Sequence, residues 1–172
     1  KINLTVVKRD DRKVREAMSE YKAAGAAFEK MKGDASDPAW AGARYWFAQG
    51  KLAEADVEFE KYLDIKFPTG LNFGDGAPEH KAQKDKAMKR FNDWFTGKTK
   101  AAEASSKKYA EVLAIKDNAN SIAAAARLGQ VTQEFSDQLF TAEIPAEVRK
   151  SQMVDGYDLA QDKVDAYCDA LT

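Results

Sequence analysis

Residues 88–112 read MKRFNDWFTGKTKAAEASSKKYAEV. Apolar or small side chains recur in this stretch at steps of three and four, which is the spacing of one helix face. The residues in that phase are Met88, Phe91, Phe95, Ala102, Ser105, Tyr109 and Val112. Only Lys98 is out of place in the phase, which continues across Gly97. The stretch therefore predicts one helix over 78–116. A break at Gly97 is the alternative, because a glycine costs a helix about 1 kcal/mol.

The same periodicity predicts helices along most of the remaining chain, with glycine, proline or asparagine where they begin and end. The expected helices span residues 10–32, 39–49, 52–66, 118–143 and 153–171. Gly50 makes the turn between the second and the third, and Asn118 or Asn120 caps the helix that follows the long one. Strand-forming residues never alternate with polar ones over a useful run. We therefore expect an all-α fold of about six or seven helices.

We expect one domain over 1–172, in which 1–9 is a linker, 10–66 and 78–172 are helical, and 67–77 is the main loop. The chain begins without methionine and ends in mid-pattern, which predicts that it is excised from a longer protein.

Charge and composition exclude several classes of function. The net charge of −1 argues against a nucleic-acid partner, because domains that hold polyanions carry a strong basic excess. No apolar run approaches the roughly 18 residues that a membrane helix needs. The single cysteine cannot form an internal disulfide, so the compartment stays open.

Residues 39–68 carry a spacing found in helical repeats. A small residue is followed by an aromatic residue, a glycine, an alanine, a second aromatic residue and a proline, which are Ala43, Trp46, Gly50, Ala55, Phe59 and Pro68. This order resembles the tetratricopeptide repeat, although Gly42 replaces the usual leucine and no period of about 34 residues recurs. The resemblance implies an irregular α-α superhelix with a concave groove, and it places Trp40, Arg44 and Phe47 in that groove as partner-binding residues.

A second resemblance covers the later part of the chain. Residues 121–130, 135–139, 142–145 and 165–171 are similar to segments of large tetratricopeptide-type envelope proteins of gliding deltaproteobacteria. This resemblance implies a scaffold subunit of a motility or trafficking complex, located in the periplasm or cell envelope.

Two charged helix faces are candidates for electrostatic docking. Nine basic residues and three acidic ones lie between positions 81 and 108. In the expected last helix, aspartates at 155, 158, 162, 165 and 169 share one side, because they recur at steps of three and four. The docking candidates are Lys84, Arg90, Asp158, Asp162 and Asp165. The two faces would bind each other or other molecules, and solvated faces are the alternative for both.

The sequence lacks a set of residues that would support catalysis. His80 is the only histidine and belongs to no Glu-x-x-His motif, which argues against a di-iron bundle. Cys168 falls on the apolar stripe of the expected last helix, which predicts an inert core thiol. Asp56, Glu58 and Glu60 alternate and so fan around a helix instead of converging. We therefore expect no enzyme, no cofactor and no metal site.

The expected function is a non-enzymatic scaffold that binds segments of partner proteins in a helical groove. A structural spacer or oligomerising helical bundle is the main alternative. Binding of an anionic membrane surface through the lysine-rich helix is a third hypothesis, and it would depend on salt.

Overall fold

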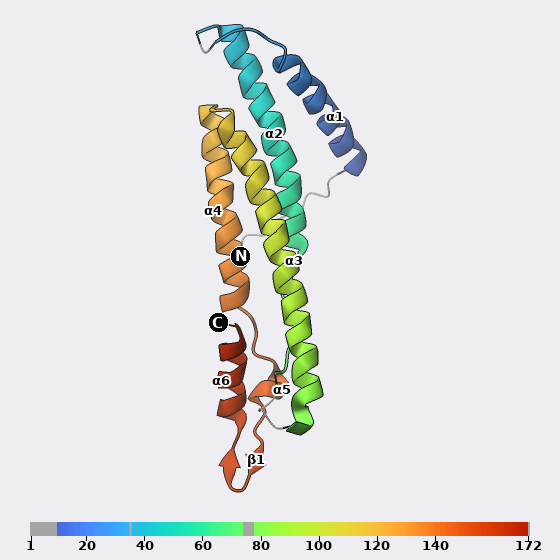
Figure 1. The fold of residues 1–172 in the computed structure, drawn as a ribbon, viewed down its shortest axis with the longest axis vertical. Helices are drawn as coiled ribbons and strands as arrows, with labels where there is room; N and C mark the ends of the chain where they lie inside the picture. Colours follow the sequence, from blue (N-terminus) through green and yellow to red (C-terminus); the bar gives the residue numbers. More distant parts are fainter. Residues whose placement is uncertain (1–9, 35, 74–77, 172) are drawn as a thin grey trace. The chain divides into compact units, whose positions relative to one another are not determined.

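The computed structural model describes residues 10–34, 36–73 and 78–171 and confirms the all-α prediction (Figure 1). Its elements are α1 (Asp11–Phe28), α2 (Pro38–Asp64), the 3₁₀ turn η1 (Pro78–His80), α3 (Lys81–Ala114), α4 (Asn118–Phe140), α5 (Ala146–Arg149), β1 (Met153–Val154), β2 (Tyr157–Asp158) and α6 (Ala160–Leu171). The tetratricopeptide-like arrangement stays a prediction, and the proposed linker over 1–9 lies outside the described residues.

Helix α1 begins where its cap predicts. The carboxylate of Asp10 accepts hydrogen bonds from the backbone N–H groups of Arg12 at 3.0 Å and Lys13 at 3.4 Å. These two donors have no partner within the helix, so the cap stabilises the first turn. The helix ends at Phe28, four residues earlier than the periodicity predicts.

Helix α2 runs without interruption through Gly50, so the predicted turn and the predicted pair of helices over 39–66 are wrong. The reason for the glycine is a close contact with α1. A Cβ atom on Gly50 would lie 3.0 Å from the Cβ and 3.1 Å from the ring of Tyr21. A glycine inside a helix costs about 1 kcal/mol, and the packing that it permits here offsets that cost.

The long helix α3 is also continuous, which confirms one helix and excludes the break at Gly97. The next helix, α4, is capped by Asp117, so the predicted caps Asn118 and Asn120 are wrong. The Asp117 carboxylate accepts from the backbone N–H of Asn120 at 3.0 Å and from its side-chain amide at 2.8 Å. Asn120 therefore reinforces the cap from within the first turn.

The last predicted helix, 153–171, begins too early. Residues 153–158 form a β-hairpin with Val154 paired to Tyr157, and α6 follows at Ala160. Asp155 and Gly156 both have positive φ, at 50° and 85°, as a two-residue type I′ turn requires. Asp-Gly is a strong signal for this turn, and it outweighs the helical periodicity of these residues.

The chain divides into two compact units. Unit 1 comprises Lys1–Glu60 and Ala104–Gly129, and unit 2 comprises Lys61–Glu103 and Gln130–Thr172. Helices α2, α3 and α4 each contribute residues to both units. The core of unit 1 contains Ala48, Leu52, Ala55, Phe59, Tyr109, Val112 and Ala124. A core cluster of unit 2 contains Leu71, Phe73, Ala87, Val148 and Tyr167.

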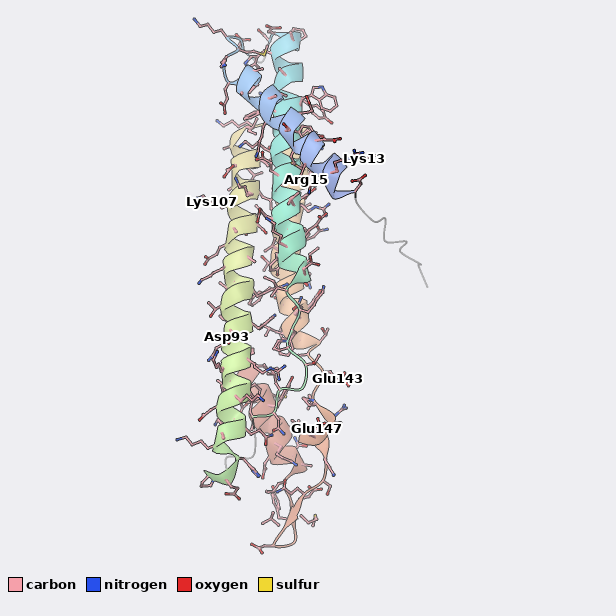
Figure 2. The ribbon with its side chains drawn as sticks, turned by 90° about the vertical axis from the view of Figure 1, so that its right-hand side faces the viewer. Lys13, Arg15, Asp93, Lys107, Glu143 and Glu147 are labelled. Atoms are coloured by element: carbon pink, nitrogen blue, oxygen red, sulfur yellow. The ribbon has the colours of Figure 1, made fainter. Side chains whose placement is uncertain are left out.

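Lys98 of unit 2 is fully buried, whereas Asp93 and Lys107 extend outward from the same helix (Figure 2). Its ammonium group donates hydrogen bonds to the carbonyl oxygens of Tyr62 at 2.8 Å and Ile65 at 3.1 Å, at the carboxyl end of α2. The Glu134 carboxylate lies 2.8 Å away. Burial lowers the pKa of Lys98, and Glu134 opposes that shift. The residue that is out of phase in the apolar stripe is thus an internal cap for α2.

Candidate partner-binding surface

The three residues assigned to a groove, Trp40, Arg44 and Phe47, lie on α2 where α1 packs against it. The Phe28 ring of α1 stacks on Phe47 at a centroid distance of 5.0 Å and contacts Trp40 at 5.6 Å. The Arg44 guanidinium lies 5.1 Å from the Trp40 ring centroid, within cation–π range. All three side chains are half-buried. The three side chains therefore lie close together, and the rings of Trp40 and Phe47 both pack against α1.

Glycines bring α1 and α2 close together from both sides. A Cβ atom on Gly25 of α1 would lie 3.0 Å from the Phe47 ring, just as one on Gly50 of α2 would meet Tyr21. Each helix thus places an aromatic ring over a glycine of the other. Close backbone approach through small residues fixes the sequence register between the two helices.

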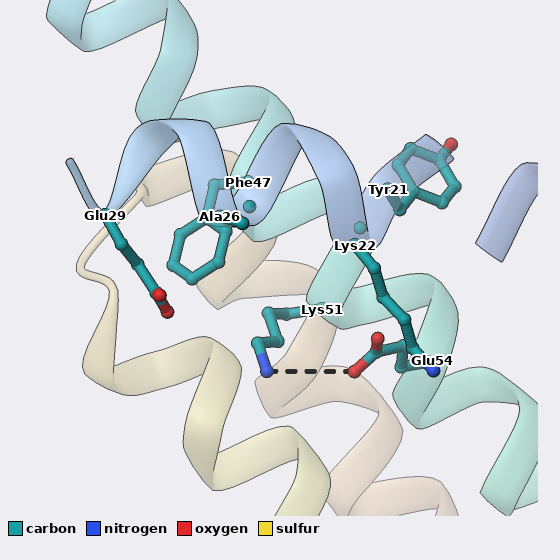
Figure 3. A pocket seen from close by; sticks show the side chains of 9 residues that line it. Tyr21, Lys22, Ala26, Glu29, Phe47, Lys51 and Glu54 are labelled. Atoms are coloured by element: carbon teal, nitrogen blue, oxygen red, sulfur yellow. Dashed lines mark ion pairs between the residues drawn. The ribbon is translucent and has the colours of Figure 1, made fainter. Parts of the chain in front are cut away.

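A cleft of about 150 Å³ opens beside this contact (Figure 3). Its walls are Tyr21, Lys22, Gly25, Ala26 and Glu29 of α1 and Phe47, Gly50, Lys51 and Glu54 of α2. Sites for small molecules usually have about 300–1,000 Å³, so this cleft has room for one side chain of a partner. Lys51 lies 3.7 Å from Glu54 and 3.7 Å from Glu111, which holds its ammonium at the rim.

The most exposed aromatic residue of α2 is not among the three that the repeat resemblance assigned to a groove. Trp46 is 59% exposed and Tyr45 is 38% exposed, and their rings form an edge-to-face pair at 5.1 Å. Trp46 precedes Phe47 by one residue, so its side chain is rotated by roughly 100° around the axis of α2 from the ring that contacts α1. The backbone carbonyl of Tyr45 accepts from Asn120 at 3.3 Å, which ties this part of α2 to α4.

A part-buried polar contact links the inner side of the same helix to α3 and α4. Tyr109 of α3 donates to the Asp56 carboxylate at 2.7 Å, and the Arg127 guanidinium of α4 lies 3.2 Å from the same oxygen. Burial raises the pKa of the Tyr109 hydroxyl, with the adjacent Asp56 adding to the shift. Asp56 therefore links α2 to α3 and α4. This leaves the outer face of α2, which points away from α3 and α4, as the side available to a partner.

The two basic docking candidates occupy different places on α3. Lys84 is exposed. Arg90 donates to the Thr69 carbonyl at 2.8 Å and lines a separate hollow of about 330 Å³ together with Lys86 and Glu147. Residues six apart on a helix differ by roughly 120° around its axis. Lys84 and Arg90 therefore do not form one binding point.

The acidic docking candidates do not share one helix face. Asp158 lies in the hairpin and accepts from the backbone N–H of Ala160, so it caps α6 instead of belonging to it. Asp162 accepts from the Tyr157 hydroxyl at 3.4 Å, and Asp165 accepts from Gln161 at 2.8 Å. Within the described part of the chain, none of the three aspartates forms an ion pair with Lys84 or Arg90.

Cys168 is exposed, so the prediction of a core thiol is wrong. Because α6 begins at Ala160, its inward face is set by Lys163 and Tyr167, one position away from the cysteine. The thiol lines an apolar cleft of about 470 Å³ with Leu139, Phe140 and Leu171.

Among the described residues, no group of three or more histidine, cysteine, aspartate or glutamate side chains is placed to hold a metal ion. No helix in this part of the chain is long and apolar enough to cross a membrane.

No family model matches the sequence, and no curated protein or solved structure is similar enough to count as a match.

Proposed function

We propose that the chain is a non-enzymatic interaction module that binds a segment of a partner protein along the outer face of α2. Trp46 anchors the partner, and the adjacent cleft between α1 and α2 receives one of its side chains. The observation that carries the proposal is the exposure of the Tyr45–Trp46 pair on α2, the helix that forms one wall of the cleft. Exposed tryptophan, tyrosine and arginine are the residue types that dominate binding energy at protein interfaces.

Arg44 adds a polar contact to this surface. Its Nε atom is buried and has no hydrogen-bond acceptor among the described residues. Leaving a buried donor unsatisfied costs about 1–3 kcal/mol. A carbonyl or carboxylate of the partner would remove that cost once the Arg44 side chain turns outward from Trp40, so the partner segment should present an acceptor there.

The test is to capture partners from a lysate of the source organism with the full chain, and then to measure the affinity of the purified partner. Trp46→Ala should weaken binding about 30-fold or more, as for a hot-spot tryptophan. Phe140→Ala is the matched control, because Phe140 is 88% exposed but lies in unit 2. Trp40→Ala is a poor variant for this purpose, since it also removes a contact with α1.

If both variants fold like the wild type and bind the partner equally well, the α2 surface is not the binding site. Loss of binding in Trp46→Ala alone supports the proposal.

An oligomerising bundle is the second candidate, and α4 favours it. Ile122 is 73% exposed, and Ala125, Ala126 and Gly129 are exposed on the same helix. Small and apolar residues permit close packing of a second helix. Sedimentation equilibrium distinguishes the two candidates, since a dimer that Ile122→Glu dissociates would favour the bundle.

A further inference from the structure

The hairpin over residues 153–158 carries apolar side chains that the other described residues cover only in part. Met153 is 62% exposed, Val154 is 44% exposed and Tyr157 is 58% exposed. Val154 and Tyr157 pair directly across the two strands, so they lie on one face, and Met153 lies on the other with Asp158. In a hairpin this short, such side chains would ordinarily turn toward a core.

Isolated two-stranded hairpins are marginally stable in water, and here the base is held by Asp158. Its carboxylate accepts from the backbone N–H of Gln152 at 3.0 Å, the backbone N–H of Ala160 at 3.0 Å and the Ser151 hydroxyl at 2.8 Å. These hydrogen bonds lower the pKa of Asp158, with the bond from Ala160 contributing most. One carboxylate thus joins the start of β1 to the first turn of α6.

Lys163 holds the same base from the inner side. Its side chain is 8% exposed, and its ammonium donates to the Lys150 carbonyl at 2.8 Å and to the Gln152 side-chain oxygen at 3.4 Å. The Leu159 N–H also donates to the Gln152 carbonyl at 3.0 Å. A buried lysine side chain is costly unless its charge is satisfied, and this one is satisfied by one backbone carbonyl and one side-chain oxygen just before the hairpin.

The hairpin therefore presents an apolar surface in a fixed conformation. A rigid surface loses little conformational entropy on binding, which is the advantage of preorganisation. The turn is fixed as well, because Asp155 and Gly156 adopt the two positive φ values of a type I′ turn. The exposed parts of the Val154 and Tyr157 side chains give no packing energy to unit 2 itself. Their energetic contribution would come from burial against another molecule.

The charges around the tip select the kind of partner. Asp155 and Asp162 are both exposed, and the Tyr157 hydroxyl donates to Asp162 at 3.4 Å. Lys163 is already buried at the base. Arg149 and Lys150 are exposed before β1, and Arg149 lies 3.7 Å from Glu143. An anionic lipid surface would repel these carboxylates, whereas lysine or arginine side chains would pair with them.

We propose that this hairpin is the binding site for a partner protein whose surface has an apolar pocket surrounded by lysine and arginine. Val154 and Tyr157 enter the pocket, and Asp155 and Asp162 meet its basic rim. The hairpin lies in unit 2, and its test does not depend on the proposed binding surface on α2, which lies in unit 1.

The test places a photo-crosslinking amino acid, p-benzoylphenylalanine, at position 157 of the full chain in a lysate of the source organism. The same amino acid at position 122 is the control, because Ile122 is also strongly exposed. The expected result is a crosslink specific to position 157, mapped by mass spectrometry to apolar residues flanked by lysine or arginine. For the purified pair, Val154→Ser should weaken binding about 10-fold.

The charge argument has its own variant. Asp155→Asn with Asp162→Asn keeps the turn, because Asn-Gly also favours type I′. It should reduce the affinity about 3–10-fold at low salt and much less at high salt. Circular dichroism shows whether each variant is folded.

Four results would overturn the proposal. The first is no crosslink beyond the control at position 122, and the second is a crosslink to a second copy of the chain. The third is sedimentation with phosphatidylglycerol vesicles that Tyr157→Ser abolishes. The fourth is an affinity that does not change in the Asp155→Asn/Asp162→Asn variant.

Discussion

Replacing Lys98 with methionine should destabilise the fold by about 3 kcal/mol. Methionine keeps most of the volume of the lysine stem, but it removes the donor for Tyr62 O and Ile65 O and the cation beside Glu134. Removing one partner of a buried ion pair costs about 3–5 kcal/mol. The expected value is at the lower end, because the Glu134 side chain is 24% exposed and keeps part of its hydration.

The measurement is urea unfolding of Lys98→Met, Glu134→Gln and the double variant, followed by circular dichroism. Once the lysine is gone, neutralising Glu134 removes an unpaired charge instead of breaking a pair. The loss of stability in the double variant should therefore be smaller than the sum of the losses in the two single variants by about 1.5–2 kcal/mol. Additive losses, within about 0.5 kcal/mol, would show that the two charges are not coupled and would refute the reasoning.

Lys89→Met is the control for this experiment. Lys89 lies 2.7 Å from Asp93, which is as close as Lys98 lies to Glu134, but the two side chains are 76% and 67% exposed. Asp93 extends outward from α3 in Figure 2. Exposed pairs contribute about 0–1 kcal/mol, so this variant should unfold almost like the wild type. The comparison separates burial from distance as the cause of the stability.

Two further predictions follow from the glycines and from Asp158. Gly50→Ala should lose about 1–2 kcal/mol by urea unfolding because its Cβ would meet Tyr21, whereas Gly42→Ala, with no atom within 4 Å, should gain about 0.5–1 kcal/mol; equal effects would refute the close contact. The pKa of Asp158 is lowered from 3.8, so its stabilisation of α6 is present above that value and is lost as the pH falls below it. In an NMR titration the Ala160 and Gln152 amides should shift below about pH 4, and Asp158→Ala should abolish that transition; a transition that persists would contradict the cap.

Helical periodicity predicts most of the fold because each long helix buries one stripe. It also marks Lys98, the only residue out of phase in its stripe, which proves to be the buried cap of α2. Helical periodicity does not predict which groups Lys98 binds, because Glu134 and the carbonyl of Tyr62 are far away in sequence. Tertiary contacts of this kind depend on how helices pack, and periodicity describes only one helix at a time.

Two errors arise where a local signal has more than one meaning. Gly50 fits a turn between two helices, but it also fits a place where an aromatic ring approaches the backbone, and the sequence of α2 alone does not separate these cases. The Asp-Gly pair at 155–156 is different. It is a specific turn signal, and it indicates a hairpin at residues where helical periodicity alone indicates a helix that begins at Met153.

The identity of the exposed aromatic residue on α2 could not be predicted from periodicity, because apolar residues occur on every side of this helix. A helix with that pattern must be covered all round or must leave one apolar side open. Gly25 and Gly50 decide which side α1 covers, since each accepts a ring of the other helix. Phe47 lies on that covered side, and Trp46, one residue earlier, is rotated by roughly 100° away from it. The placement of α1 therefore removes Phe47 from the surface and leaves Trp46 as the aromatic residue that a partner can reach.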